Sequence, residues 1–374
     1  MLDSFGLPVQ ADRGRNPMPE PLRIARQGCF FTGGRYVPRD GGRAMQGQMF
    51  VQFQVPAEMR RPEPVVMIHG TGQTGANFLG TPDGRPGWAE DFLRAGYAVY
   101  VVDQAGRGRS GQDAAHGAYD RWSAERVAQT FTDPASHALY PQARLHRQWP
   151  GGQGRPGDPL FDQFYASQVD YLADPAATEA LVLEANLELL ERIGPAILLT
   201  HSQSGVFGWK LADTRPDLVR AILAVEPNGP PFFDITFHGG EDWYRDSDGP
   251  GRPWGITRLP LTFEPPAESP ADLAPQRQEV PDGPGLVRCW LQAEPARQLP
   301  RLKGIPIAVV TGEASYRATC DHCTVKFLRQ AGVEAEHLRL EEHGIHGNGH
   351  MMMLEENSSE VAALMLRWLE RRLP

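Results

Sequence analysis

The stretch Thr200-His201-Ser202-Gln203-Ser204-Gly205 decides how this chain of 374 residues is interpreted. It follows the apolar run 196–199, which is typical of a buried strand, and a helical pattern comes after it at 206–212. A serine on a tight turn between strand and helix is held in a strained, exposed conformation, the geometry of a nucleophile elbow. Thr200 and Ser204 replace the glycines of the usual G-x-S-x-G pattern, so the pentapeptide alone also fits an ordinary strand end.

Composition and charge exclude several classes of protein. With 41% hydrophobic and 22% charged residues, the chain has the make-up of a soluble globular protein with a large core. Its formal charge of -9 and the lack of a basic stripe argue against a nucleic-acid partner. No apolar run approaches the roughly 20 residues that span a bilayer, so no membrane partner is expected. The segment 1–10 lacks a long apolar stretch, which predicts a cytoplasmic location, or a periplasmic one if a leader was removed.

Short apolar runs alternate with helical patterns along the chain. This alternation predicts an α/β fold with a mostly parallel central sheet and helices on both faces. The predicted strands are 28–31 with 36–37, 49–55, 64–68, 98–102, 196–202, 221–225, 305–311 and 336–340, the first two forming a hairpin. The predicted helices are 88–95, 176–192, 206–212, 321–331 and 360–371.

The segments between these elements predict the domain organisation. Residues 1–27 are rich in Pro and Arg and are interpreted as an N-terminal arm. Residues 28–374 are interpreted as one domain. Two Pro-rich and aromatic stretches at about 112–170 and 230–301 interrupt its periodic pattern, which predicts cap or lid insertions.

Two other motifs carry little weight for a cofactor or metal. The turn 104–111 matches G-x-G-x-x-G, but no apolar helix pattern follows, and Arg107 and Arg109 make the turn bulky. Cys320 and Cys323 are most simply structural residues at a helix start, with a reversible disulfide or metal binding as alternatives. We therefore expect no cofactor and no metal.

An elbow serine needs a base, a group that orients the base, and donors for the developing oxyanion. Candidates for the base are His343, His346 and His350, which all follow the last predicted strand. We choose His350 because it follows Gly349 and precedes an apolar stretch, so that its loop can lie over Ser202. The other two histidines are interpreted as solvated or structural.

Three acidic residues are candidates for the orienting group. Glu226 ends a predicted strand that we expect beside the serine strand, and from there its carboxylate can reach an imidazole. Glu313 lies in the loop after the strand 305–311, the usual place for the acid, and stays the alternative. We favour Glu226, with Asp321 in third place.

Two backbone amides are predicted to form the oxyanion hole. One is the amide of Gln203, the residue after the serine. The second is the amide of Thr71, which follows the strand end at His69-Gly70. Donors of this kind each contribute about 10²-fold or more to acyl-transfer rates.

Taken in order along the chain, these motifs resemble an α/β-hydrolase from about residue 28 onward. The resemblance is carried by His69-Gly70, by the turn 103–111, by the elbow at 200–205 and by Gly349-His350. The stretches 224–227 and 348–351 further resemble a bacterial esterase subfamily with a Ser–Glu–His triad, whose Glu follows the sixth strand. The resemblance implies a mostly parallel sheet, hydrolysis of carboxylic esters and, often, a homodimer.

The working hypothesis is therefore a serine hydrolase that acts on a small ester or lactone. Ser202 would attack the carbonyl, with His350 as base and Glu226 as its partner. Aromatic residues within 232–263 and the run 351–353 suggest an apolar or aromatic acyl pocket, although such side chains are more often core. The alternatives are an acyltransferase or carbon–carbon bond hydrolase with the same triad, and a non-catalytic ligand-binding relative.

Overall fold

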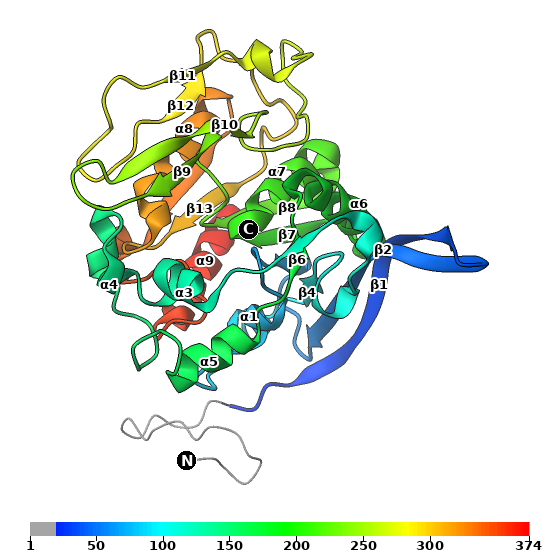
Figure 1. Cartoon of the computed structure of the whole chain (residues 1–374). Coiled ribbons are helices and arrows are strands. Elements are labelled where there is room, and N and C mark those ends of the chain that lie inside the picture. The colour runs from blue at the N-terminus through cyan, green and yellow to red at the C-terminus, as the bar shows by residue number, and fades with distance from the viewer. Residues whose placement is uncertain (1–19, 374) are drawn as a thin grey trace.

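A computed structural model describes residues 20–373 (Figure 1). Within this range the main sheet has eight strands in the order β1-β2-β4-β3-β7-β8-β13-β14. They are β1 (Ile24–Arg39), β2 (Gly42–Pro56), β3 (Val65–Ile68), β4 (Val99–Asp103), β7 (Ala196–His201), β8 (Val219–Val225), β13 (Ile307–Thr311) and β14 (Ala335–Arg339).

The sheet is parallel from β4 to β14, and the β1–β2 hairpin is added antiparallel at the β4 edge. The inner strands β3 and β7 are mostly apolar because helices cover both faces of the sheet, and every residue of these two strands is buried. The predicted fold class is thereby confirmed. The hairpin is much longer than predicted, and in Figure 1 its blue loop extends away from the body.

Helices form a layer on each face of the sheet. They are α1 (Ala76–Leu79), α2 (Trp88–Arg94), α6 (Pro175–Ile193), α7 (Gly205–Thr214), α8 (Asp321–Gln330) and α9 (Ser358–Arg372). One apolar cluster joins the sheet to α6, α7 and α8, through side chains such as Leu189, Trp209 and Phe327. The other joins it to α2 and α9, through Trp88 and Trp368. The five predicted helices are present, with ends shifted by one or two residues.

Sequence signals at the ends of α6 explain where it begins and stops. The Asp174 side chain accepts hydrogen bonds from the amides of Ala176 and Ala177, which caps the first turn. Pro175 takes the first helical position, where no amide donor is needed. Gly194 ends the helix with a φ of 86°, a conformation that costs other residues energy.

Short elements fill the two stretches that were predicted as insertions. The first holds β5 (Tyr119–Asp120), α3 (Ala124–Val127), α4 (Pro134–His137) and α5 (Pro159–Ala166), with β6 (Tyr171–Leu172) just beyond it. The second holds β9 (Phe232–Phe237), β10 (Tyr244–Arg252), β11 (Pro275–Arg277) and β12 (Trp290–Gln292). Figure 1 shows β9 to β12 gathered at the upper left, above β13.

The predicted N-terminal arm is covered only in part. Residues 1–19 lie outside the described residues, and β1 already begins at Ile24, so residues 24–27 belong to the sheet.

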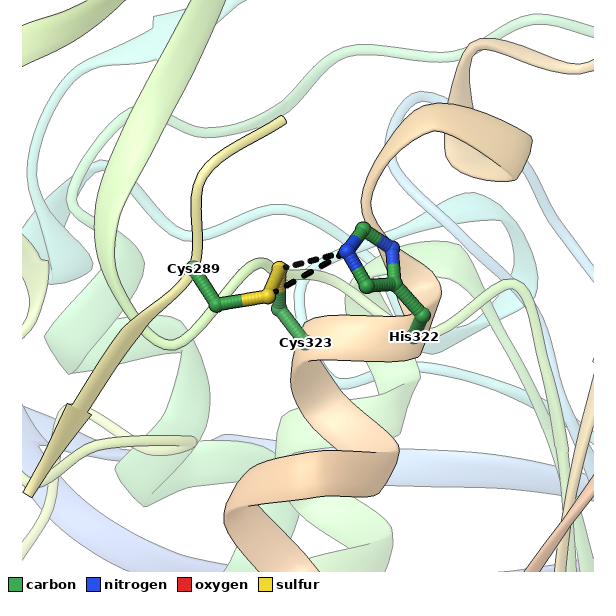
Figure 2. A group of neighbouring side chains, drawn as sticks. All are labelled: Cys289, His322 and Cys323. Atoms are coloured by element: carbon green, nitrogen blue, oxygen red, sulfur yellow. Dashed lines mark hydrogen bonds between the residues drawn. A yellow bond between two sulfur atoms is a disulfide. The ribbon is translucent and has the colours of Figure 1, made fainter. Parts of the chain in front are cut away.

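A disulfide joins the second insertion to α8. Cys323, in the first turn of α8, is bonded to Cys289, which lies 34 residues earlier and directly before β12 (Figure 2). Cys320, the residue before α8, is a buried free thiol. Cys320 and Cys323, which are close in sequence, are therefore not bonded to each other, and the pairing of Cys323 with Cys289 was not predicted.

We expect the double change Cys289→Ala and Cys323→Ala to lower the free energy of unfolding by about 3 to 4 kcal/mol, because closing a loop of this length restricts the unfolded chain. Urea unfolding of the oxidised protein measures the loss. Cys320→Ala, which removes a buried thiol without opening a loop, is the matched control. A double variant no less stable than this control would contradict the expectation.

Candidate active site

Ser202 adopts the left-handed conformation that the elbow interpretation requires. Its φ is 55°, at the junction between β7 and α7. Ser204, in place of a glycine, uses its hydroxyl to bridge two strands: it accepts from the amide of His201 (2.7 Å) and donates to the carbonyl of Ile68 (2.6 Å). Ser204, which stands where the usual pattern has glycine, thus adds a hydrogen bond between the elbow and the end of β3.

Two glycines allow neighbouring segments to approach the elbow closely. A Cβ added at Gly205 would lie 2.4 Å from the Cβ of Pro227, so α7 packs directly on the chain that follows β8. A Cβ at Gly70 would lie 2.9 Å from the Cβ of Ser202. The loop after β3, which carries Thr71, therefore lies beside the serine.

Glu226 and His350 form a buried pair. The Nδ1 atom of His350 lies 2.5 Å from Oε2 of Glu226, and both side chains are fully buried. Glu226 directly follows β8 and has a φ of 45°. Its carboxylate also accepts hydrogen bonds from the amide of Gly312 (2.8 Å) and the hydroxyl of Ser315 (2.6 Å). Both carboxylate oxygens are therefore held in place, and Nδ1 of His350 is oriented by one of them.

Burial sets the protonation of this pair. It raises the pKa of Glu226 well above its usual value, and the charge of Asp321 adds to this, whereas hydrogen bonds from Ser315 and Gly312 oppose it. Burial, reinforced by His201 and Arg317, lowers the pKa of His350 well below its usual value. With its pKa lowered, the imidazole of His350 is neutral near pH 7, and with Nδ1 donating to Glu226 the lone pair lies on Nε2.

The His350 loop is attached to the elbow itself. Nε2 of His201 donates to the carbonyl of His350 (3.0 Å), and the two rings lie 4.6 Å apart between centroids. Within residues 20–373, however, no hydrogen bond joins the Ser202 hydroxyl to His350, and the partner of Nε2 is the hydroxyl of Tyr316 (3.2 Å). Hydrogen bonds of this kind are often long without substrate and tighten in the reacting complex.

The other candidate residues have different partners. Glu313 contacts Nδ1 of His346 (3.2 Å) and accepts from the amide of Gly347 (2.8 Å), so this carboxylate holds the loop before His350. Asp321 accepts from the hydroxyl of Thr311 (2.8 Å). Burial raises the pKa of Asp321 to about 7.

A second buried carboxylate, which sequence reasoning missed, supports the loop of His350. Glu355 accepts hydrogen bonds from the amide of Gly349 (2.8 Å) and the side-chain amide of Asn348 (2.8 Å). Its Oε1 also lies 2.8 Å from Nε2 of His146, a residue of the first insertion. The only sequence signal was the short spacing between Glu355 and the loop.

Arg107, which the sequence places in a turn of little weight as a cofactor site, reaches the elbow. Its buried guanidinium donates to the carbonyl of Gly70 (2.8 Å) and to the side-chain oxygen of Gln203 (2.7 Å). Thr71, one predicted oxyanion donor, directly follows Gly70 in the chain. Gln203, the other predicted donor, is bonded by Arg107 itself. This one side chain therefore ties the loop after β3 to the residue after the serine.

Comparison with known proteins identifies the fold family. The sequence description of the alpha/beta hydrolase family matches residues 65–364. The chain belongs to this family. A curated fungal protein named "Probable secreted lipase phiG" (Fungal sp., strain ATCC 74256) is 44% identical over 348 residues, which cover 92% of this chain and 89% of that protein. A solved structure described as a novel bacterial esterase is 26% identical, with a TM-score of 0.63, and the match covers 96% of this chain and all of that one.

In this α/β hydrolase, aromatic side chains from both insertions surround His350. Phe131 stacks on its ring with centroids 5.1 Å apart, and Trp122 stacks on Phe131 (5.4 Å). Phe237 contacts Tyr316 (6.1 Å), whose ring lies 4.7 Å from that of His350. Ser202 is only 8% exposed. The run 351–353 that was considered for the acyl pocket is entirely buried in the core beneath α9.

Cys289, His322 and Cys323 lie close enough to hold a metal, but the two sulfurs are bonded to each other and offer no thiolate (Figure 2). Two hollows of about 400 and 430 Å³ lie elsewhere: one beside Trp243 and Arg288, the other beside His346. No helix within residues 20–373 is long and apolar enough to cross a membrane.

The lowered pKa of His350 predicts how the reactivity of Ser202 varies with pH. Because only the neutral imidazole accepts a proton, reactivity is lost as the pH falls through the pKa of His350, which lies below its ordinary value of 6.5. We expect the rate at which a fluorophosphonate labels Ser202 to fall to half its maximum well below pH 6.5. A half-maximum at or above that pH would show that burial does not depress this pKa.

Proposed function

We propose that the chain is a serine hydrolase that cleaves carboxylic esters or lactones through an acyl-enzyme on Ser202. The observation that carries this proposal is the 2.5 Å contact between Glu226 and His350, made next to a serine with a φ of 55°. The relative named a probable secreted lipase, 44% identical over 92% of this chain, supports the same reaction class.

In the proposed first step, Nε2 of His350 removes the proton of the Ser202 hydroxyl as the serine oxygen attacks the carbonyl carbon. Glu226 keeps Nδ1 facing away from the serine and stabilises the imidazolium that forms. The amides of Thr71 and Gln203 donate to the oxyanion, and Arg107 fixes the two segments that carry them. The imidazolium then protonates the leaving alcohol, and a water molecule releases the acyl group by the same sequence of steps.

The proposed substrate has an apolar or aromatic group next to the scissile bond. Support comes from rings of both insertions that pack on His350 or on its ring neighbours Phe131 and Tyr316: Trp122, Phe131 and Tyr140 from the first insertion, and Phe237 from the second. Aromatic walls of this kind stabilise apolar ligands by removing their surface from water.

We also propose that the protein works in an oxidising compartment, which departs from the cytoplasmic location indicated by the sequence. A disulfide such as Cys289–Cys323 persists where thiols are not kept reduced. The fungal relative is named a probable secreted lipase, which supports the same compartment. The homodimer implied by the family resemblance stays a prediction.

Labelling and a substrate screen test the function. We expect a fluorophosphonate to label Ser202, and we expect hydrolysis of p-nitrophenyl esters, with Ser202→Ala at least about 10⁴-fold slower because the nucleophile is gone. Ser359→Ala, at an exposed serine of α9, is the control and should match the parent chain. A screen of esters, lactones and amides identifies the acyl bond.

A folded protein that is neither labelled nor active would favour a non-catalytic ligand-binding member of the family. Consumption of esters that depends on added alcohol would favour acyl transfer instead, and cleavage confined to carbon–carbon substrates would favour a carbon–carbon hydrolase.

The choice of acid is tested by two matched amide substitutions. Glu226→Gln keeps the shape but removes the charge that stabilises the imidazolium, so we expect kcat to fall by about 10²- to 10⁴-fold. Glu313→Gln should change kcat by less than about tenfold, because Glu313 contacts His346 and Gly347 and not His350. Steady-state kinetics on one p-nitrophenyl ester compares them. A loss confined to Glu313→Gln would overturn the assignment of Glu226.

A further inference from the structure

The hydroxyl of Tyr316 contacts Nε2, the ring nitrogen of His350 that Glu226 does not hold. Nδ1 is held by Glu226, and Nε2 lies 3.2 Å from the Tyr316 hydroxyl. A neutral imidazole with its proton on Nδ1 has a lone pair on Nε2, so here the phenol donates and the nitrogen accepts. The hydroxyl of Tyr316 is therefore in contact with the atom that moves the proton in the proposed reaction.

Neighbouring residues hold Tyr316 in this position. Ser315, the preceding residue, donates to Glu226, so consecutive side chains contact the acid and the base. Arg317, the following residue, bonds the carbonyl of Gly229 and the side chain of Asn228, in the segment just after Glu226. The short helix that contains Tyr316 (Tyr316–Thr319) is thereby attached to both partners of the pair.

The phenol keeps its proton throughout the reaction. Burial raises the pKa of Tyr316 to about 12; the neighbouring Arg317 opposes that rise and the charge of Glu226 adds to it. Tyr316 therefore acts as a hydrogen-bond donor, and it neither supplies nor removes a proton near neutral pH.

Protonation of Nε2 removes the lone pair that accepts the hydrogen bond of the Tyr316 hydroxyl. Once the nitrogen has taken the serine proton, it has no lone pair and cannot accept from Tyr316. The oxygen of the leaving group must then lie within about 3 Å of Nε2 to receive that proton. The Tyr316 hydroxyl lies 3.2 Å from Nε2, so a leaving oxygen beside Nε2 is an acceptor within its reach.

We propose that Tyr316 is a catalytic residue whose hydroxyl donates a hydrogen bond to the leaving-group oxygen as the bond from carbonyl carbon to oxygen breaks. This inference rests on the proposed function. The electron pair of the breaking bond stays on the leaving oxygen, which receives its proton from Nε2 of His350. The hydrogen bond from Tyr316 stabilises the negative charge that builds up on this oxygen before the proton arrives.

The chemistry of the alcohol provides a sharp test. An alkoxide is a strong base that needs a donor in order to leave, whereas p-nitrophenolate delocalises its charge and leaves without one. Removal of the Tyr316 hydroxyl should therefore slow alkyl esters selectively. A hydrogen bond to a charged oxygen corresponds to about 10- to 100-fold in rate.

The experiment compares Tyr316→Phe with the parent chain on p-nitrophenyl butanoate and ethyl butanoate, which share one acyl group. The measured quantity is kcat/KM, because it reports acylation from free enzyme and substrate. We expect Tyr316→Phe to lose about 10- to 100-fold on the ethyl ester and less than about threefold on the p-nitrophenyl ester. The retained p-nitrophenyl activity also shows that the variant is folded.

Tyr140→Phe is the matched control. Tyr140 packs against Tyr316 with ring centroids 6.5 Å apart, but its hydroxyl donates to the carbonyl of Ala314 and not to His350. Any effect of this substitution should be the same on both esters.

The outcomes separate this inference from the proposed function. Equal losses on both esters, or no loss on either, would mean that Tyr316 has only a structural role, and the inference would be wrong while the hydrolase assignment stands. If Ser202→Ala hydrolysed both esters as fast as the parent chain, the proposed function itself would fail, and the role of Tyr316 with it.

Discussion

The left-handed backbone of Ser202 is the constraint around which this molecule is arranged. A residue other than glycine with a φ of 55° is disfavoured by about 1–3 kcal/mol, and it persists only where the surrounding structure determines it. Here three neighbours do so. Gly70 and Gly205 allow the loop after β3 and the chain after β8 to lie against the turn, and Ser204 bonds it to the end of β3. The strain is therefore balanced by tertiary packing, which the small residues of the elbow itself, Ser204 and Gly205, make possible.

The parallel register extends this constraint to the next strand. His201 is paired with Val225, so Ser202 and Glu226 leave β7 and β8 at the same level of the sheet. Glu226 is also left-handed, with a φ of 45°, and its amide donates to the carbonyl of Val310 in β13. Because adjacent strands are about 4.8 Å apart, a hydroxyl and a carboxylate are presented side by side at the carboxyl edge. A ring that lies over this edge can approach both of them.

A layer of buried polar side chains holds that ring and the opposing loop. Ser315 and Glu355 fix the carboxylate of Glu226 and the loop of His350, and Arg107 fixes the loop after β3. Buried networks of this kind are rigid when each group is paired, because every unpaired polar atom would be costly away from water. The two insertions add aromatic rings around His350, so the sheet edge supplies the polar groups and the insertions supply the apolar surroundings.

The sequence by itself determined the parallel strands of the main sheet, the main helices and the elbow at Ser202, because these depend on local periodicity and on the residues that can turn the chain. It also identified His350 and Glu226 as residues that follow strands. It could not decide which carboxylate meets the His350 ring: Glu226 and Glu313 both follow strands, and only the tertiary structure turns one to His350 and the other to His346. The same holds for Arg107, Tyr316, Glu355 and the Cys289–Cys323 bond, whose partners come from distant segments of the chain. Such contacts leave no periodic signal, because they depend on where separate elements pack and not on the order of residues within any one of them.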